Sequence, residues 1–308
     1  LLLMPLALAI SPISTLRMRF VLAIAYGATV GGILTPVGTP PNLIFLGFLE
    51  QNGLEAIPFL KWILLCSPLA LIMLITLSLV LSLGLKNVNL DQALPEPQAL
   101  NKDQKKLSFI LIFLGLILLF NSPIEPYYSG LGINEKLLLL GFGLLMFAPG
   151  SNFLSWEDTR KTPYEILFLF GAGFGIAASV QSTGLDMTIA QYLLSFSNWP
   201  SWLLILCIAS MVTFSTEITS NMALTTVAIP IIFSLCQITG LNPYLYMMVA
   251  TICASYAFML PIATAPNAIA MASGAVRVRE MARYGFMLNC IAVVLTTIVA
   301  NILWSIFL

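Results

Sequence analysis

The chain has 308 residues, of which 59% are hydrophobic and only 8% are charged. Soluble domains carry about 25% charged residues, so this composition excludes a water-soluble globular protein. Lysine plus arginine (13) balance aspartate plus glutamate (13), which leaves no net field to attract nucleic acid. Histidine is absent, so the commonest general base and metal ligand is missing. We therefore expect an all-α integral membrane protein that is not an enzyme and has no nucleic-acid partner.

Apolar runs that could cross a bilayer, which takes about 20 residues, recur along the chain. In order, the predicted crossings are 18–49 (interrupted), 62–83, 107–120, 137–148, 163–181, 244–273 (interrupted) and 284–308. The ends of the two short runs, 107–120 and 137–148, are expected to include flanking polar residues. Residues 185–199 predict an amphipathic helix at the outer surface. The run 201–239 is broken by a polar tract, so it is either two crossings or a re-entrant hairpin.

The positions of lysine and arginine decide between these two interpretations. If 201–239 is re-entrant, eleven of the 13 basic residues gather on one side and only Lys61 and Lys136 lie on the other. If it counts as a net crossing, the basic cluster 277–283 moves to the wrong side. We therefore predict an outward-opening hairpin, a cytoplasmic basic side and an external C-terminus.

A polar tract at 86–106, with two prolines and seven charges, divides the chain. It predicts a cytoplasmic linker between residues 1–85, the end of a first repeat, and residues 107–308, a second repeat. The chain opens at Leu1 in the middle of an apolar run, so we expect the beginning of the first repeat to be missing.

The two predicted repeats align when the chain is shifted by 225 residues. Thr39-Pro40-Pro41-Asn42 then meets Thr264-Ala265-Pro266-Asn267, and Pro36 meets Pro261. A pair of ordinary proline kinks would not produce these matches at one offset. The first interrupted span runs outward and the second inward, so the repeats have inverted topology. Inverted repeats with broken helices are typical of secondary transporters, which bind substrate and ions near the membrane midplane.

Three stretches together resemble the divalent anion/sodium symporter (DASS) family: Gly31–Asn42 (GGILTPVGTPPN), Thr216–Asn221 (TEITSN) and Ser255–Asn267 (SYAFMLPIATAPN). The resemblance spans the chain, which corresponds to the later part of a full member. It implies a homodimeric sodium symporter of small divalent anions, most simply C4-dicarboxylates such as succinate, malate and fumarate. It also implies an elevator mechanism and a place in the plasma membrane, the inner membrane in bacteria. A sulfate or citrate symporter, or a proton-coupled or exchange-type transporter, stays open as an alternative.

The resemblance also implies the site residues. Substrate would be bound by Ser220, Asn221, Met222, Thr39, Thr264 and Pro266. Sodium would lie at Gly38 on one side and at Thr216, Thr219, Asn221 and Ala263 on the other, held by backbone carbonyls and neutral side-chain oxygens. No organic cofactor is implied. Met222 departs from the family pattern, which has threonine there, so it either alters the dicarboxylate site or marks a permissive position.

Three further polar residues need a role, two in the interrupted spans and one in the predicted hairpin. Asn42 and Asn267 are expected to cap the second half-helices and not to touch substrate. An ionised carboxylate at membrane depth costs about 2.5–3.5 kcal/mol, so Glu217 should face protein or water. It is either a proton or cation site or a hydrogen-bonded group that pins the hairpin, and the family pattern favours the second.

Overall fold

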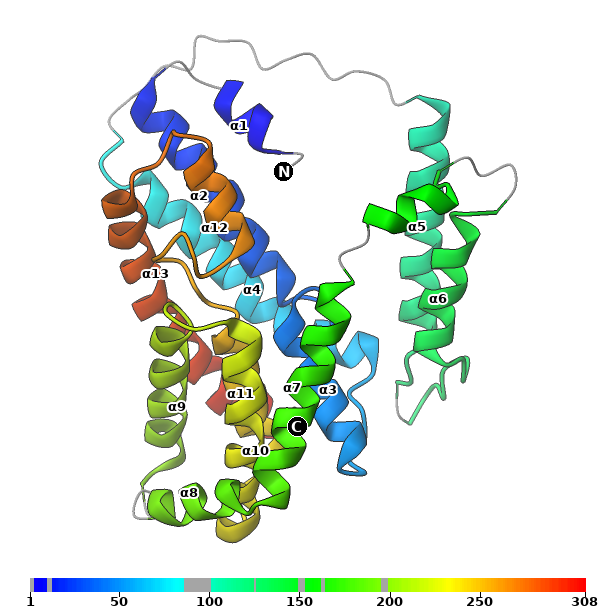
Figure 1. Cartoon of the computed structure of the whole chain (residues 1–308). Coiled ribbons are helices and arrows are strands. Elements are labelled where there is room, and N and C mark those ends of the chain that lie inside the picture. The colour runs from blue at the N-terminus through cyan, green and yellow to red at the C-terminus, as the bar shows by residue number, and fades with distance from the viewer. Residues whose placement is uncertain are drawn as a thin grey trace. The chain divides into compact units, whose positions relative to one another are not determined.

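The computed structural model describes residues 3–9, 13–85, 101–124, 126–148, 153–161, 164–194 and 199–308. Most of the predicted linker at 86–106 therefore lies outside the described residues. Within them, regular secondary structure is helical, apart from an isolated bridge between Ile124 and Tyr128 (Figure 1). This confirms the all-helical class.

The helices follow one another along the chain with these bounds. They are α1 (Met4–Ala9), α2 (Ser14–Gly32), α3 (Pro40–Gln51), α4 (Phe59–Ser82), α5 (Lys102–Asn121), α6 (Glu135–Leu145), the 3-10 helix η1 (Trp156–Lys161), α7 (Glu165–Ser182), α8 (Leu185–Leu193), α9 (Ser201–Ser215), α10 (Asn221–Thr239), α11 (Pro243–Ala254), α12 (Ala265–Ala272), α13 (Val278–Val299), the π-helical turn η3 (Ala300–Trp304) and α14 (Ser305–Phe307).

The chain divides into two compact units. The smaller unit comprises residues 57–63 and 95–169 and contains α5 and α6, which lie side by side (Figure 1). Its helix α5 begins before the predicted crossing at 107–120, as expected, because Asn101 starts it with a capping box. The Asn101 side chain accepts from the Gln104 backbone N–H at 2.7 Å, and the Gln104 side chain accepts from the Asn101 N–H at 2.9 Å.

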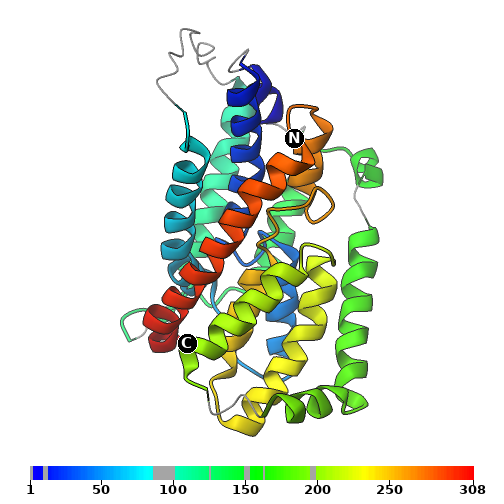
Figure 2. The ribbon, with the colours of Figure 1, turned by 90° about the vertical axis from the view of Figure 1, so that its left-hand side faces the viewer.

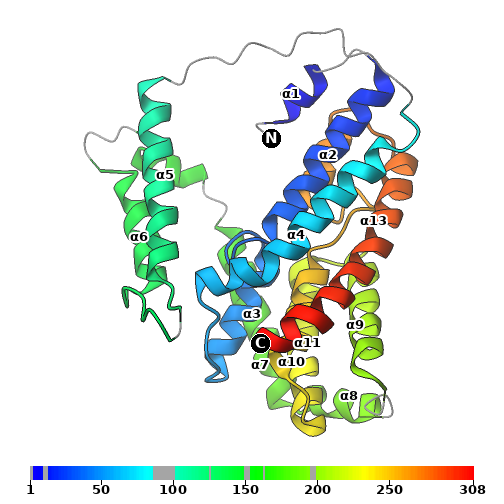
Figure 3. The same cartoon turned by 180° about the vertical axis from the view of Figure 1, so that it is seen from behind.

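The larger unit comprises residues 1–56, 64–94 and 170–308. Here the helix α11 packs against both α9 and α10, and α13 packs against α9 (Figures 2 and 3). The predicted hairpin thus consists of two helices joined by residues 216–220, with α11 in contact with each arm. The helix predicted at 185–199 corresponds to α8, which ends at Leu193 and is in contact with α10; residues 195–198 lie outside the described residues.

Both interrupted spans are broken where the sequence places the TxPN segments. The helix α3 begins directly after Thr39, whose backbone is extended (φ −146°, ψ 146°). The helix α12 begins directly after Thr264, with nearly the same conformation (φ −141°, ψ 151°). The two segments therefore share a local fold at the offset of 225 residues.

The outward faces of the helices are apolar. Along α4, the exposed side chains include Leu64, Leu71, Ile75 and Leu79, each about 60% exposed, while Leu69 and Met73 of the same helix are fully buried. A helix that is apolar all round belongs in a membrane or a large core. Three helices of the described chain are long and apolar enough to cross a membrane: Phe59–Ser82, Asn221–Thr239 and Val278–Phe307.

Candidate functional site

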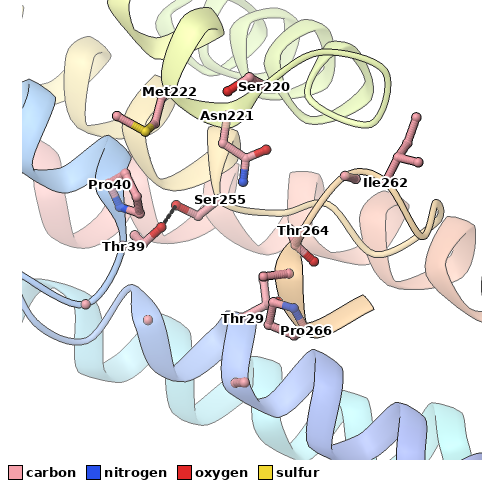
Figure 4. A pocket seen from close by; sticks show the side chains of 15 residues that line it. Thr29, Thr39, Pro40, Ser220, Asn221, Met222, Ser255, Ile262, Thr264 and Pro266 are labelled. Atoms are coloured by element: carbon pink, nitrogen blue, oxygen red, sulfur yellow. Dashed lines mark hydrogen bonds between the residues drawn. The ribbon is translucent and has the colours of Figure 1, made fainter. Parts of the chain in front are cut away.

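A pocket of about 400 Å³ lies in the larger unit, where the broken helices and the predicted hairpin meet (Figure 4). Its walls come from the end of α2, the start of α3, the start of α10 and the loop between α11 and α12. Among the predicted site residues it brings together Gly38, Thr39, Ser220, Asn221, Met222, Ala263, Thr264 and Pro266. Thr216 and Thr219 are the two predicted site residues that do not line it.

The pocket is polar without being charged. None of its lining residues in the described chain is acidic or basic. Its polar side chains are hydroxyls and one amide: the Thr39 and Ser255 hydroxyl oxygens lie 3.5 Å apart across two different segments (Figure 4). A ligand that enters the pocket therefore meets neutral oxygen and nitrogen groups together with helix ends.

The start of α10 offers groups of this pocket that can bind an anion. The N-terminal N–H groups of a helix have no intrahelical partner and carry partial positive charge. In α10 the residue before the helix, Ser220, makes no side-chain cap to these groups, so the groups and the Ser220 hydroxyl stay available to a ligand. The start of α3 offers less, because Pro40 and Pro41 have no N–H and the Asn42 N–H bonds the Thr39 carbonyl at 3.1 Å.

Several oxygen atoms lie close to the side chain of Asn221. The Thr216 hydroxyl lies 2.6 Å from Asn221 Oδ1 and 2.9 Å from the Ala254 carbonyl oxygen, at the C-terminal end of α11. A hydroxyl has one proton and can donate to only one of these acceptors. Together with the negative end of the α11 dipole, this group suits a hard cation. Thr219 is exposed and its hydroxyl donates to the Ser215 carbonyl at 2.7 Å.

The prediction that Asn42 and Asn267 cap the second half-helices is wrong. Thr39 and Thr264 occupy the capping positions, and each asparagine is fully buried one turn further on. Asn42 Nδ2 donates backwards to the Thr35 carbonyl at 2.9 Å, and Asn267 Nδ2 donates to the Ala257 and Leu260 carbonyls at 2.9 and 3.1 Å. The two side chains therefore hold the loops of the broken helices. Neither lines the pocket, as expected.

Glu217 pins the tip of the predicted hairpin. Its buried carboxylate accepts from the backbone N–H groups of Met259 and Leu260, at 2.8 and 3.0 Å, and from Asn289 Nδ2 at 2.7 Å. The first two donors belong to the loop between α11 and α12, and the third belongs to α13. This confirms the structural interpretation of Glu217.

Two polar lining residues were not predicted, Thr29 and Ser255. Both lie at the C-terminal end of the helix that precedes a break, α2 for Thr29 and α11 for Ser255. The alignment of the two repeats drew attention only to the helices that follow the breaks. Ser255 is the first residue of one of the stretches that carry the family resemblance. A polar residue at this position in an apolar span was the signal that could have identified it as a site residue.

Broken apolar helices that meet at an uncharged polar pocket are typical of integral, multi-pass membrane proteins of the transporter class. Residues 13–308 match the family described as the sodium:sulfate symporter transmembrane region, and the chain belongs to that family. This confirms the DASS resemblance.

Curated relatives include transporters from two staphylococci. The sodium-dependent dicarboxylate transporter SdcS of Staphylococcus saprophyticus is 26% identical over 309 residues, which cover 94% of this chain and 60% of the relative. SdcS of Staphylococcus aureus strain MRSA252 is 28% identical over 306 residues, which cover 94% of this chain and 59% of the relative. The chain therefore spans about three fifths of the length of these relatives.

Proposed function

We propose that this chain carries the substrate site of a sodium-coupled symporter of small divalent anions, with C4-dicarboxylates such as succinate, malate and fumarate as the substrate class. The observation that carries the proposal is the uncharged pocket between the start of α10 and the broken-helix loops. Family membership and the relatives named as sodium-dependent dicarboxylate transporters support it.

The negative charge of the ligand and the lack of charged side chains in the pocket explain why substrate binding would need sodium ions. A dianion that leaves water for a site without lysine or arginine loses solvation that helix ends alone do not restore. A sodium ion at Gly38 and another at Thr216, Thr219, Asn221 and Ala263 would supply that positive charge and order the loops before substrate arrives. Neither proposed sodium site contains a titratable side chain, which favours sodium over proton coupling.

A dicarboxylate is preferred to sulfate because of Met222. This side chain is buried, lines the pocket and extends toward Pro40 (Figure 4). Its thioether offers apolar contact to the methylene carbons of a dicarboxylate, whereas sulfate has no apolar surface. Citrate, which has a third carboxylate, would need more positive charge than the two proposed sodium ions supply.

Transport would follow an elevator mechanism. The whole pocket belongs to the larger compact unit, which we propose moves as a block against scaffold helices that include α5 and α6. This mechanism uses the two inverted repeats, residues 1–85 and 107–308, joined by the cytoplasmic linker 86–106. The working protein would be a homodimer in the plasma membrane, the inner membrane of a bacterium.

Competition experiments test the substrate class. Uptake of labelled succinate is measured in cells that produce the natural protein containing this chain, with unlabelled malate, fumarate, sulfate and citrate as competitors. The proposal expects malate and fumarate to compete and sulfate and citrate to have little effect. Uptake of labelled sulfate in the same cells, without uptake of succinate, would contradict it.

A further inference from the structure

A further pocket of the larger unit, about 360 Å³ in volume, lies between α2 and α4 and shares no lining residue with the substrate pocket. Its lining residues run from Leu16 to Gly27 along α2, and from Leu74 to Leu85 along α4 and the turn that follows it. The eleven helical steps from Leu16 to Gly27 measure about 16 Å, so the pocket is elongated along the helices. We call it the α2/α4 groove. The two helices run in opposite directions, so the start of α2 lies beside the end of α4 (Figure 3).

The α2/α4 groove is apolar over most of its length. Besides one arginine, the polar side chains among its described lining residues are Ser78 and Ser82, whose hydroxyls donate to carbonyls of their own helix at 2.9 and 2.8 Å. Both serines are exposed, so the groove is open along this side of α4. Gly27 leaves the space empty, because a Cβ there would meet no atom within 4 Å. The same helix α4 also exposes Leu71 and Ile75, so an apolar surface continues outside the groove.

A buried positive charge lies at one end of this groove. Arg19 lines it and is only 9% exposed. Its Nη1 donates to the carbonyls of Leu81 and Leu83, at 2.5 and 2.7 Å, and its guanidinium lies 5.6 Å from the centre of the Tyr284 ring. None of these partners in the described chain is a carboxylate, and Nε has no hydrogen-bond partner there. Buried charges are normally paired, so Arg19 carries a positive charge that a bound anion would neutralise.

This charge lies at the end of a membrane helix. The helix α4 is long and apolar enough to cross a membrane, and the carbonyls that Arg19 contacts are at its C-terminal end. Further basic side chains lie near the same end of α2, since Arg17 and Arg277 line a pocket between the starts of α2 and α13. The sequence analysis predicts that this side is cytoplasmic. Anionic lipids of the cytoplasmic leaflet attract basic residues at such positions, and basic pockets between membrane helices bind lipid headgroups.

We propose that the α2/α4 groove binds an anionic phospholipid of the phosphatidylglycerol type. Its phosphate accepts hydrogen bonds from the guanidinium of Arg19, and one acyl chain lies in the groove toward Gly27. The second chain covers the exposed apolar face of α4. Charge complementarity selects this occupant, because the net negative headgroup neutralises Arg19 and a free phosphate ion would leave the apolar length of the groove empty. The site does not depend on which anion the protein transports.

Native mass spectrometry of the natural protein in detergent tests this site. Phosphatidylglycerol, phosphatidylcholine with the same acyl chains, or inorganic phosphate is added, and the bound fraction is measured. Wild type should bind phosphatidylglycerol about tenfold or more tightly than phosphatidylcholine. Arg19→Gln should lower the affinity for phosphatidylglycerol about tenfold or more and remove this preference, because it removes hydrogen bonds between two charged groups. Gly27→Leu fills the groove and should weaken both lipids, by about fourfold for each CH₂ group that it displaces.

Two variants are matched controls and should bind lipid as wild type does. Arg279→Gln removes an exposed charge from the start of α13, and Gly31→Leu places the same new side chain at another glycine of α2 that has open space around it. Unchanged binding in Gly27→Leu, or equal binding of the two lipids by wild type, overturns the inference. Inorganic phosphate that binds wild type as tightly as the lipid overturns it too. If Arg19→Gln does not fold because α4 loses its contacts, Gly27→Leu decides alone.

Discussion

Replacement of Glu217 tests how the hairpin tip is held. The carboxylate accepts three hydrogen bonds, two at Oε1 and one at Oε2. In Glu217→Gln the amide oxygen can keep two of them, but the NH₂ group then faces the N–H of Leu260. The loss is one charge-assisted bond, about 1.5–3 kcal/mol, and the other two bonds weaken. In Glu217→Ala three buried donors lose their acceptor, which costs about 3–9 kcal/mol.

The assay is the fraction of purified protein that remains monodisperse in detergent after a series of temperatures. Glu217→Gln should aggregate at a lower temperature than wild type, and Glu217→Ala should fail to accumulate in the membrane. Glu55→Gln, at an exposed position, is the control and should behave as wild type. If Glu217→Ala were as stable as wild type, the hydrogen bonds of Glu217 would not be what holds the tip of the hairpin. If Glu217→Gln kept full stability but lost transport, Glu217 would be a proton or cation site after all.

Three further substitutions address the pocket. A Cβ at Gly38 would collide with the Gly32 carbonyl, so Gly38→Ala should abolish sodium-dependent uptake, whereas Gly31→Ala, with open space around it, should retain it; equal activity of the two would contradict the loop geometry. Asn221→Ala should abolish uptake while membrane insertion, followed by membrane fractionation, stays intact; near-normal uptake would refute its place in the site. Met222→Thr should weaken succinate binding about fourfold, the value of one buried CH₂ group, and should strengthen competition by sulfate; unchanged competition would show that Met222 does not select the anion.

The positions of the helix breaks could be predicted because their chemistry is local. Prolines at 40, 41 and 266 remove backbone donors, and a threonine before each segment can start a new helix. The roles of Asn42 and Asn267 were misjudged from the same motif. A proline forces the residue before it into an extended conformation, so Thr39 had to be the capping residue, and Asn42 was left to bond the loop behind it.

The contacts that hold the site together could not be predicted, because they join residues far apart in the chain. Glu217 bonds Asn289, and the buried Asp186 of α8 accepts from Ser234 of α10 at 2.5 Å. Each partner is an ordinary polar residue in its own segment. The packing of α10 against α8 and of α13 against α9 brings these groups together. This packing cannot be predicted from the periodicity of the sequence.

Sodium-gradient transport is the most direct test of the proposed function. The natural protein containing this chain is reconstituted into liposomes, and uptake of labelled succinate is followed with and without an inward sodium gradient. We predict uptake that requires external sodium and is competed by unlabelled malate. Succinate uptake of equal rate with potassium in place of sodium would contradict the coupling and favour a proton-coupled or exchange-type transporter.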